Sequence, residues 1–310
     1  MKQLSFIISA CNAKCIGESI DYTIQKIVID SRVIHNGEAV IFAAINTSRN
    51  DGHQFIVDAY SKGVRCFIVS QEVDFNLFPG AIFLLVDDTI AALQALAVAV
   101  REQYSIPIIG LTGSNGKTIT KEWLNHLLTG SFNIVRSPKS YNSQIGVPLS
   151  VWLMNQHHTL GIFEAGISQM GEMNLLEKMI QPTIGVFTNI GEAHNQGFEN
   201  SKQKINEKLV LFKDSESLIY CQDYEELHDC ILLFSQKTTA QRRSPLNRFS
   251  WSYKHKDASL QIKFVHKSFG KTNIRAIYEN RELEIEIPFT DAASIENAIN
   301  CWCVLLYRSE

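Results

Sequence analysis

Between residues 107 and 221, short apolar runs alternate with longer amphipathic stretches, and this alternation restricts the fold more than any other feature. The apolar runs have the length of strands, and the stretches between them repeat with the period of a helix. Strands and helices that alternate in this way form right-handed crossovers, which build a mostly parallel sheet with helices on both faces. We therefore predict an α/β fold. The expected strands are 107–112, 132–136, 159–163, 183–188 and 217–221, and the expected helices are 117–128, 144–155, 171–180 and 201–213.

The chain on either side of this stretch has a different pattern. Residues 24–104 form a shorter α/β pattern, which predicts a small α/β domain. After Arg248, alternating runs separated by turn residues favour antiparallel hairpins at one edge of the larger sheet. We place the boundary near 104–106, which gives domains 1–104 and 105–310. Expected elements of the flanks are strands 27–29, 40–45, 66–69, 82–86, 249–253, 260–267, 273–278 and 283–288, and helices 52–62, 89–104 and 292–306.

Composition agrees with a globular protein of two domains. The 310 residues exceed the roughly 150 expected of one domain. Hydrophobic residues make up 45% and charged residues 20%, a balance that argues against disorder. The formal net charge is −3, with 29 basic and 32 acidic residues, which gives no general attraction to nucleic acid or to an anionic membrane. A bound anion must therefore be held by local groups.

We expect a cytoplasmic location. The seven cysteines are scattered, which fits reduced thiols better than a disulfide framework. Residues 8–11 resemble a lipoprotein cleavage box, but the apolar run 4–8 is shorter than the roughly 7 to 15 residues of a signal core. The longest apolar stretch, 90–100, is below the ~18 residues that span a bilayer. The sequence therefore predicts neither export nor a membrane span.

The strongest chemical signal follows the expected strand 107–112 and reads Gly113-Ser114-Asn115-Gly116-Lys117-Thr118. A glycine-rich turn between strand and helix lets backbone N–H groups point at a phosphate, while a lysine reaches the terminal phosphates and a hydroxyl ligates magnesium. The spacing departs from the common G-x4-G-K-T loop, since Leu111 stands where its first glycine would be. The position between a strand and a helix nevertheless favours phosphate binding over an ordinary turn, and ATP is the expected nucleotide.

Three further side chains are candidates by position alone. Glu164 ends an expected parallel strand, at the edge where open α/β sheets bind ligands, and could hold Mg2+; a capping or surface glutamate is the alternative. His194 follows another strand end and is either a ligand or an ordinary loop histidine. Lys208 shares its expected helix with three other lysines, so residue type alone favours a solvated basic face.

The phosphate segment, with Thr112 before it and Thr120-Lys121-Glu122 after it, resembles the nucleotide loop of the Mur ligases of peptidoglycan synthesis. Within that family the chain is similar to the MurF type, the UDP-N-acetylmuramoyl-tripeptide:D-alanyl-D-alanine ligases. The similarity includes N-S-Q-I-G-V-P at 142–148 and E-A-G at 164–166 with G-E at 171–172. In the amino-terminal part, D-S-R at 30–32, F-A-A at 42–44 and D-G-H at 51–53 resemble the uridine-nucleotide domain that MurE and MurF share.

The resemblance implies roles in catalysis and metal binding for the first candidates. Lys117 would contact the β and γ phosphates of ATP, and Thr118 and Glu164 would hold a first Mg2+. His194 would serve a second Mg2+. Lys208, four residues before a phenylalanine as in the family's K-x-x-x-F pattern, would be carbamylated. A carbamate turns a cation into an anionic oxygen ligand, which suits a hard metal.

The resemblance also implies binding roles for other residues. Asn297 matches the family's adenine-contacting asparagine, although Ala293-Ser294 stand where the family has a His-Asn pair. The candidates for contacts with the UDP moiety are Ser31, Arg32 and Asn46, and the candidate for the muramoyl peptide is Asn142.

The reaction that the resemblance implies uses ATP to convert the tripeptide's terminal carboxylate into an acyl phosphate, which the amine of D-alanyl-D-alanine then attacks. The family has a third, carboxy-terminal domain that closes over ATP and binds the incoming dipeptide. We expect that domain to be absent from these 310 residues, and the chain alone to be inactive as a ligase. Some family members are fused to an alanine racemase, so a fused or partner racemase domain is a further expectation.

Three alternatives stay open on the sequence. A MurE-type ligase, which adds the third amino acid of the peptide, has a similar amino-terminal domain but fits residues 142–148 less well. A truncated fragment could bind nucleotide and UDP-sugar without ligase activity. A P-loop kinase or GTPase is disfavoured by the loop spacing and by the lack of a guanine-reading N/T-K-x-D motif.

Overall fold

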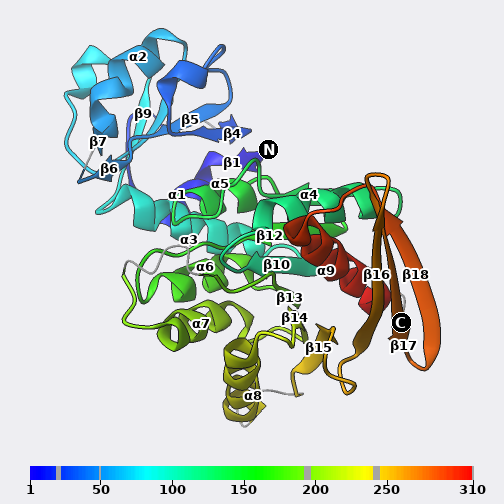
Figure 1. The fold of residues 1–310 in the computed structure, drawn as a ribbon. Coiled ribbons are helices and arrows are strands. Elements are labelled where there is room, and N and C mark those ends of the chain that lie inside the picture. The colour runs from blue at the N-terminus through cyan, green and yellow to red at the C-terminus, as the bar shows by residue number, and fades with distance from the viewer. Residues whose placement is uncertain (19–21, 49, 192–196, 240–244, 309–310) are drawn as a thin grey trace. The chain divides into compact units, whose positions relative to one another are not determined.

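A computed structural model describes residues 1–18, 22–48, 50–191, 197–239 and 245–308. The chain divides into two compact units, Met1–Gln103 and Tyr104–Glu310, and each has its own sheet. The first unit runs from blue to cyan in Figure 1, and the second runs on to red. In both units helices accompany a main sheet whose strands are mostly parallel, so the predicted α/β class is confirmed.

The first unit is built on a five-stranded sheet with the order β2-β9-β8-β5-β4. Four strands are parallel and β2 alone is antiparallel. Its core includes Phe67 and Phe83, whose rings stack with centroids 5.0 Å apart. The unit's strands are β1 (Lys2–Gln3), β2 (Lys14–Ile16), β3 (Thr23–Ile24), β4 (Lys26–Val28), β5 (Val40–Ala43), β6 (Asn46–Thr47), β7 (Asn50–Asp51), β8 (Cys66–Val69) and β9 (Ile82–Leu85), and its helices are α1 (Leu4–Cys11), α2 (Ile56–Ser61) and α3 (Thr89–Arg101).

Helix α1 was not predicted from the sequence. Its Leu4, Ile7 and Cys11 are buried, and they recur at the spacing of one helix face, which packs against α3. The predicted helix 52–62 is divided between a 3-10 turn, Gly52–Phe55, and α2. The apolar run at the start of the chain therefore belongs to the core of this unit.

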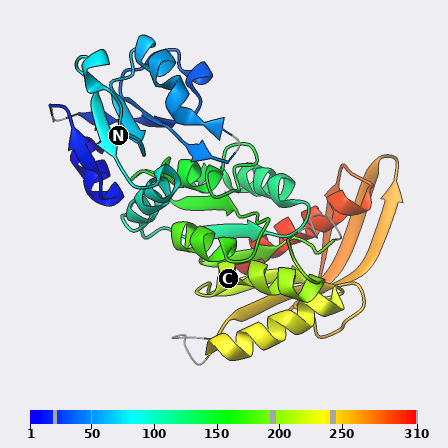
Figure 2. The same ribbon diagram turned by 90° about the vertical axis from the view of Figure 1, so that its left-hand side faces the viewer.

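The second unit contains a nine-stranded sheet with the order β11-β12-β10-β13-β14-β15-β16-β17-β18. The strands from β11 to β16 pair in parallel, whereas β16, β17 and β18 are antiparallel and extend from the parallel part, in orange in Figure 2. The strands are β10 (Ile108–Thr112), β11 (Ile134–Arg136), β12 (Leu160–Glu164), β13 (Ile184–Phe187), β14 (Ser217–Cys221), β15 (Asn247–Ser252), β16 (Leu260–Ser268), β17 (Lys271–Tyr278) and β18 (Arg281–Ile287).

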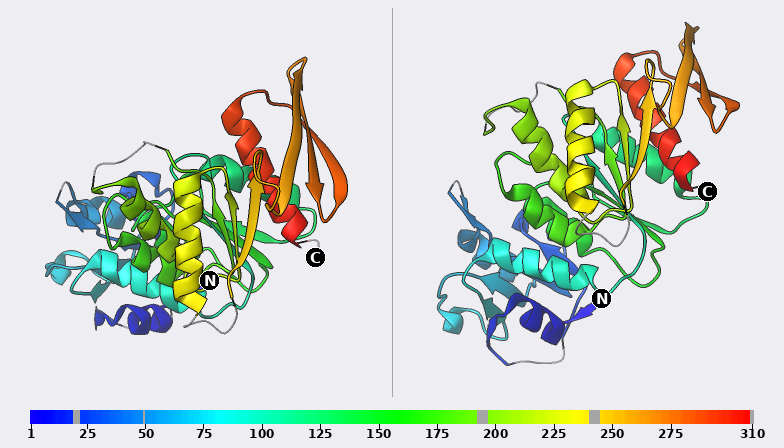
Figure 3. Two further views of the ribbon diagram at one scale, coloured as in Figure 1. Left: turned by 60° about the horizontal axis from the view of Figure 1, so that its bottom comes forward. Right: turned by 90° about the horizontal axis from the view of Figure 1, so that it is seen from below.

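Helices cover both faces of this sheet. Helices α4 and α9 pack against each other on one face, and α5 to α8 follow crossovers that run the other way along the sheet. Figure 3 shows α8 in yellow and α9 in red on opposite sides of the strands. The helices are α4 (Lys117–Leu128), α5 (Gly146–Val151), α6 (Glu172–Ile180), α7 (Ser201–Leu209), α8 (Glu225–Thr239) and α9 (Ala292–Arg308).

The predicted antiparallel strand 249–253 is wrong in direction. Strand β15 is parallel to β14. The chain leaves the end of β14, returns through helix α8, which we did not predict, and enters β15 at the edge of the sheet where β14 begins. The signal for α8 was present, since Leu227, Cys230 and Ile231 are buried at helical spacing. The predicted helix 144–155 is shorter in the structure, where α5 ends at Val151.

Strand β10 occupies the position that matters for ligand binding. The crossover through α4 leaves β10 in one direction, and the later crossovers build the sheet in the other direction. Open α/β sheets bind ligands at such a switch point, beyond the carboxyl ends of the strands. Among the described residues, no helix is long and apolar enough to cross a bilayer.

Candidate functional site

The glycine-rich loop joins β10 to α4 at the switch point. Gly113 and Gly116 have φ angles of +142° and +82°, which side-chain-bearing residues rarely adopt. A Cβ on Gly113 would lie 2.1 Å from Oγ1 of Thr188, and one on Gly116 would lie 2.3 Å from Oδ1 of Asn297. Both glycines are therefore required by backbone angle and by space.

The segment that follows β13 holds the loop from beside it. The Ser114 N–H donates to the Asn189 carbonyl at 2.9 Å, and the Asn115 N–H donates to Asn189 Oδ1 at 3.0 Å. The Thr188 hydroxyl donates to the Asn115 carbonyl at 2.5 Å. Sequence reasoning missed Asn189, although its position after a parallel strand end was a usable signal.

Lys117 opens α4 and folds back over the loop. Its Nζ donates to the carbonyl oxygens of Gly113 at 2.8 Å and Ser114 at 3.1 Å. Burial lowers the pKa of Lys117, while the nearby Glu164 carboxylate acts in the opposite direction. The ammonium thus lies directly on the loop whose shape suits a phosphate.

A hydroxyl and a carboxylate meet beside this lysine. Thr118 Oγ1 donates to Glu164 Oε2 at 2.9 Å, and Glu164 is fully buried at the end of β12. A serine or threonine hydroxyl and a carboxylate are the oxygen ligands that magnesium takes in nucleotide sites. The residues present therefore fit a bound Mg2+.

Helix α7 supplies two more lysines to the same place. Lys208 is only 4% exposed and donates from Nζ to the Gly113 carbonyl at 3.1 Å. Lys204 is 2% exposed and donates to the Gly191 carbonyl at 3.3 Å. Burial lowers the pKa of Lys208 to about 7, and the charges of Lys117 and Lys204 contribute. The alternative of a solvated basic face is wrong for these two lysines.

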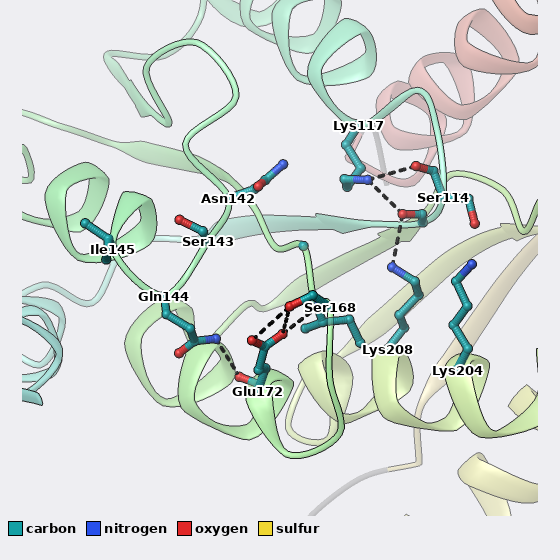
Figure 4. A pocket seen from close by; sticks show the side chains of 13 residues that line it. Ser114, Lys117, Asn142, Ser143, Gln144, Ile145, Ser168, Glu172, Lys204 and Lys208 are labelled. Carbon is teal, nitrogen blue, oxygen red and sulfur yellow. Dashed lines mark hydrogen bonds between the residues drawn. The ribbon is translucent and has the colours of Figure 1, made fainter. Parts of the chain in front are cut away.

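These groups surround a cavity of about 490 Å3, within the range of ligand pockets. Figure 4 shows Lys117 on one side and Lys204 and Lys208 on the other, with their amino groups converging. Within the described ranges of the chain, Glu172 is the only acidic side chain that lines the cavity, and it accepts hydrogen bonds from the N–H groups of Ser168 and Gln169. A cavity with this charge balance suits a polyanion. Its lining residues are Gly113, Ser114, Lys117, Asn142, Ser143, Gln144, Ile145, Gly166, Ile167, Ser168, Glu172, Lys204 and Lys208.

The segments 142–148 and 164–172 come together on the far side of this cavity. The Gly166 N–H donates to the Asn142 carbonyl at 2.8 Å, and Gln144 Nε2 donates to the Glu172 carbonyl at 3.0 Å. Asn142 lines the cavity, as Figure 4 shows. The two motifs thus form one wall opposite the phosphate loop.

Asn297 reaches the loop from α9. It is 5% exposed, and its Oδ1 accepts a hydrogen bond from the Thr120 hydroxyl at 3.3 Å. Its position against Gly116 brings α9 to the first turn of α4. His194, the last candidate of this unit, lies outside the described residues.

The candidates in the first unit lie at the carboxyl ends of β4 and β5. Ser31 is buried and Asn46 is exposed. Arg32 is exposed and forms an ion pair with Asp30, with Nη2 and Oδ2 2.8 Å apart. This pairing lowers the pKa of Asp30 to about 2. All three candidates thus share one edge of the five-stranded sheet.

Residues 111–305 match the family model of the Mur ligase middle domain. The chain belongs to the Mur ligase family. A curated UDP-N-acetylmuramoyl-tripeptide--D-alanyl-D-alanine ligase of Borreliella burgdorferi is 30% identical to this Mur ligase, over 99% of the chain and 66% of the relative. A ligase of the same name from Bacillus subtilis is 33% identical over 64% of the chain and 44% of the relative. The chain therefore spans less than two thirds of the length of these relatives.

Two solved structures share the fold of this Mur ligase. A crystal structure of MurF from Acinetobacter baumannii has a TM-score of 0.84 at 22% identity and covers 100% of this chain and 65% of that chain. The MurF ligase of Thermotoga maritima, in complex with ADP, has a TM-score of 0.78 at 22% identity and covers 94% and 65%. The predicted family is confirmed, whereas the individual roles of the candidate residues stay predictions.

Proposed function

We propose that this Mur ligase is the nucleotide- and UDP-sugar-binding part of an ATP-dependent ligase that joins D-alanyl-D-alanine to UDP-N-acetylmuramoyl-tripeptide in peptidoglycan synthesis. The observation that carries the proposal is the convergence of Lys117, Lys204 and Lys208 on one cavity, beside the Thr118–Glu164 pair. That arrangement suits a magnesium nucleotide. The names of the relatives support the choice of substrates.

In the proposed reaction, the tripeptide's terminal carboxylate attacks the γ-phosphorus of ATP to give an acyl phosphate and ADP. The amine of D-alanyl-D-alanine then attacks the acyl carbon, and phosphate leaves. Lys117 would hold the β and γ phosphates in place of the two carbonyls it now contacts. The protein contributes position and charge neutralisation, and no protein nucleophile is needed.

Two Mg2+ ions would supply further neutralisation of the phosphate charge. Thr118 and Glu164 would hold the first ion, and His194 and Lys208 are proposed for the second. Lys208 would serve as a carbamate, formed when its neutral amine attacks CO2 and a proton is released. A pKa of about 7 supports this step, because a sizeable fraction of the amine is neutral near pH 7.

The remaining contacts are assigned to the other candidates. Asn297 would contact adenine and Asn142 the muramoyl peptide, while the first unit would take the UDP moiety through Ser31, Arg32 and Asn46. A cytoplasmic location agrees with the seven cysteines, which are all free thiols. The fused or partner racemase domain stays a prediction.

An assay of product formation by the protein isolated from its natural source tests the proposal. The protein is incubated with ATP, Mg2+, UDP-N-acetylmuramoyl-tripeptide and D-alanyl-D-alanine, and mass spectrometry looks for the pentapeptide product and ADP. Omission of each component in turn is the control. Product from the UDP-linked dipeptide and a single amino acid, but none from the tripeptide, would instead assign a MurE-type reaction.

A further inference from the structure

A second lysine of α4 is buried more completely than any lysine of the cavity. Lys121 is 0% exposed and lies one helical turn after Thr118. Its Nζ is 2.9 Å from Glu164 Oε1, and both side chains are inaccessible to solvent. Neither the phosphate loop nor the proposed metal ligands include this residue.

The ammonium of Lys121 also holds the segment that follows β11. It donates to the carbonyl oxygens of Ser137, at 2.7 Å, and of Lys139. Ser137 in turn accepts the Glu164 backbone N–H on its side-chain oxygen at 3.2 Å. An ammonium that is removed from water is stable only when acceptors and negative charge around it replace the water, and these carbonyl oxygens supply part of that replacement.

The two oxygens of Glu164 have different partners, and Oε1 is held by the charge of Lys121 alone, since it accepts no hydrogen bond within the described part of the chain. Oε1 faces Lys121, and Oε2 accepts the Thr118 hydroxyl at 2.9 Å. Lys121 thus leaves Oε2 as the oxygen that lies beside the phosphate loop. The same ammonium links this carboxylate to residues 137–139, which lead directly to Asn142 on the opposite wall of the cavity.

We propose that Lys121 is a positioning residue for the nucleotide's metal: it fixes the Glu164 carboxylate with Oε2 beside Thr118, and it ties that carboxylate to the segment that leads to Asn142. Lys121 contacts no nucleotide atom in this assignment and acts only through Glu164. The inference rests on the proposed function to the extent that the cavity takes a magnesium nucleotide.

A purely structural role makes a different prediction. A lysine that only neutralises a buried carboxylate would affect the free energy of unfolding, but it would leave the benefit of Mg2+ to nucleotide binding unchanged. The decisive quantity is therefore the ratio of the Kd of a non-hydrolysable ATP analogue in EDTA to its Kd in Mg2+. Calorimetric titration gives both values on the same protein.

Four variants of the chain are compared with the wild type. We expect Lys121→Met and Glu164→Gln each to reduce the ratio by about 10- to 100-fold, as changes around metal ligands commonly do. The double variant should lose no more than Glu164→Gln alone, because Lys121 acts through that carboxylate. Glu122→Gln is the matched control, since Glu122 also contacts Lys121 Nζ, at 3.1 Å, but is partly exposed and does not contact Glu164.

An unchanged ratio of the two Kd values in folded Lys121→Met would overturn the inference. So would a double variant whose ratio falls by the product of the two single reductions, because the two residues would then act independently. Where Lys121→Met does not stay folded by circular dichroism, Lys121→Gln replaces it, because an amide keeps a donor for a carbonyl but no charge for Glu164. A wild-type chain that binds the analogue equally well with and without Mg2+ would count against the proposed function instead.

Discussion

The phosphate-loop side of the second unit and the candidate uridine site of the first unit lie at equivalent edges of their sheets but are built differently. In the second unit, Glu164, Lys121 and Lys208 are buried and each is held by groups distant in the sequence. In the first unit, the Arg32 side chain is 86% exposed, and its partner Asp30 is two residues away. One site is fixed by the fold and the other by a local turn.

This difference has a physical cause. Buried charges are stable only when their partners are in place, so a site made of them has its geometry before the ligand arrives. Exposed charges cost little and are screened by water, so they can adjust to a ligand at the expense of side-chain entropy. We expect substitutions in the two sites to differ accordingly in their effects on binding and on folding.

The largest expected effect is on nucleotide affinity. Lys117→Met removes the ammonium that lies on the phosphate loop, and charged hydrogen bonds contribute about 1.5 to 3 kcal/mol each. The affinity for an ATP analogue with Mg2+ should therefore fall on the order of tenfold to a hundredfold, as measured by calorimetric titration. Unchanged affinity would contradict the comparison of the two units, because the buried site of the second unit would then not be the nucleotide site.

The next effect is on folding. Gly116→Ala places a Cβ 2.3 Å from Asn297 Oδ1 at a φ of +82°, so it should lower the free energy of unfolding by about 1 to 3 kcal/mol in urea titrations. Gly130→Ala is the control, since a Cβ there meets nothing within 4 Å. Equal stability of the two variants would show that the loop is less constrained than its contacts indicate.

A third test uses pH. Burial lowers the pKa of Lys208 from 10.5 to about 7, so between these values the unfolded chain binds a proton that the folded chain lacks. The free energy of unfolding should then rise with pH across this window through Lys208, and Lys208→Met should lose that contribution. Urea titrations of both proteins in CO2-free buffer from pH 7 to pH 9 measure the difference, which should widen in favour of the wild type as pH rises.

The smallest effect is expected in the first unit. Arg32→Ala should leave the urea midpoint unchanged, because the side chain is exposed and its ion pair with Asp30 is solvated. Its affinity for UDP should fall, but by less than Lys117→Met reduces the affinity for ATP. A clear loss of stability would show that this edge, too, is fixed by the fold.

The parallel sheet and the phosphate loop could be predicted from the sequence, because both depend on short-range patterns. Apolar runs of strand length predicted β10, β12, β13 and β14, and the glycines of the loop indicated the positive φ angles that they adopt. Its position at a strand end brought Glu164 into the candidate site, and the family resemblance brought in Asn297; the structure places both beside the loop.

The rest depends on contacts between residues far apart in the chain. Nothing local distinguishes Lys204 from its exposed neighbour Lys202; only the packing of α7 against the loop buries it. The proposed role of Lys121 in α4 depends on carbonyls 16 and 18 residues away and on the carboxylate at the end of β12. The direction of β15 likewise follows from helix α8, whose helical spacing of apolar residues we did not recognise in the sequence.

The two edge strands of the nine-stranded sheet are the places where another chain could add to it. Unpaired edge strands invite other chains to add to the sheet, which is a route to aggregation. One edge, β11, is only three residues long. The other, β18, is longer but exposes Glu282, Glu284 and Glu286 along its length. Glu284 and Glu286 form ion pairs with Arg275 and Lys271 of the neighbouring strand β17, so the long edge carries exposed charged pairs. A chain that added to β18 would have to lie against these charges, which disfavours the use of this edge as a template.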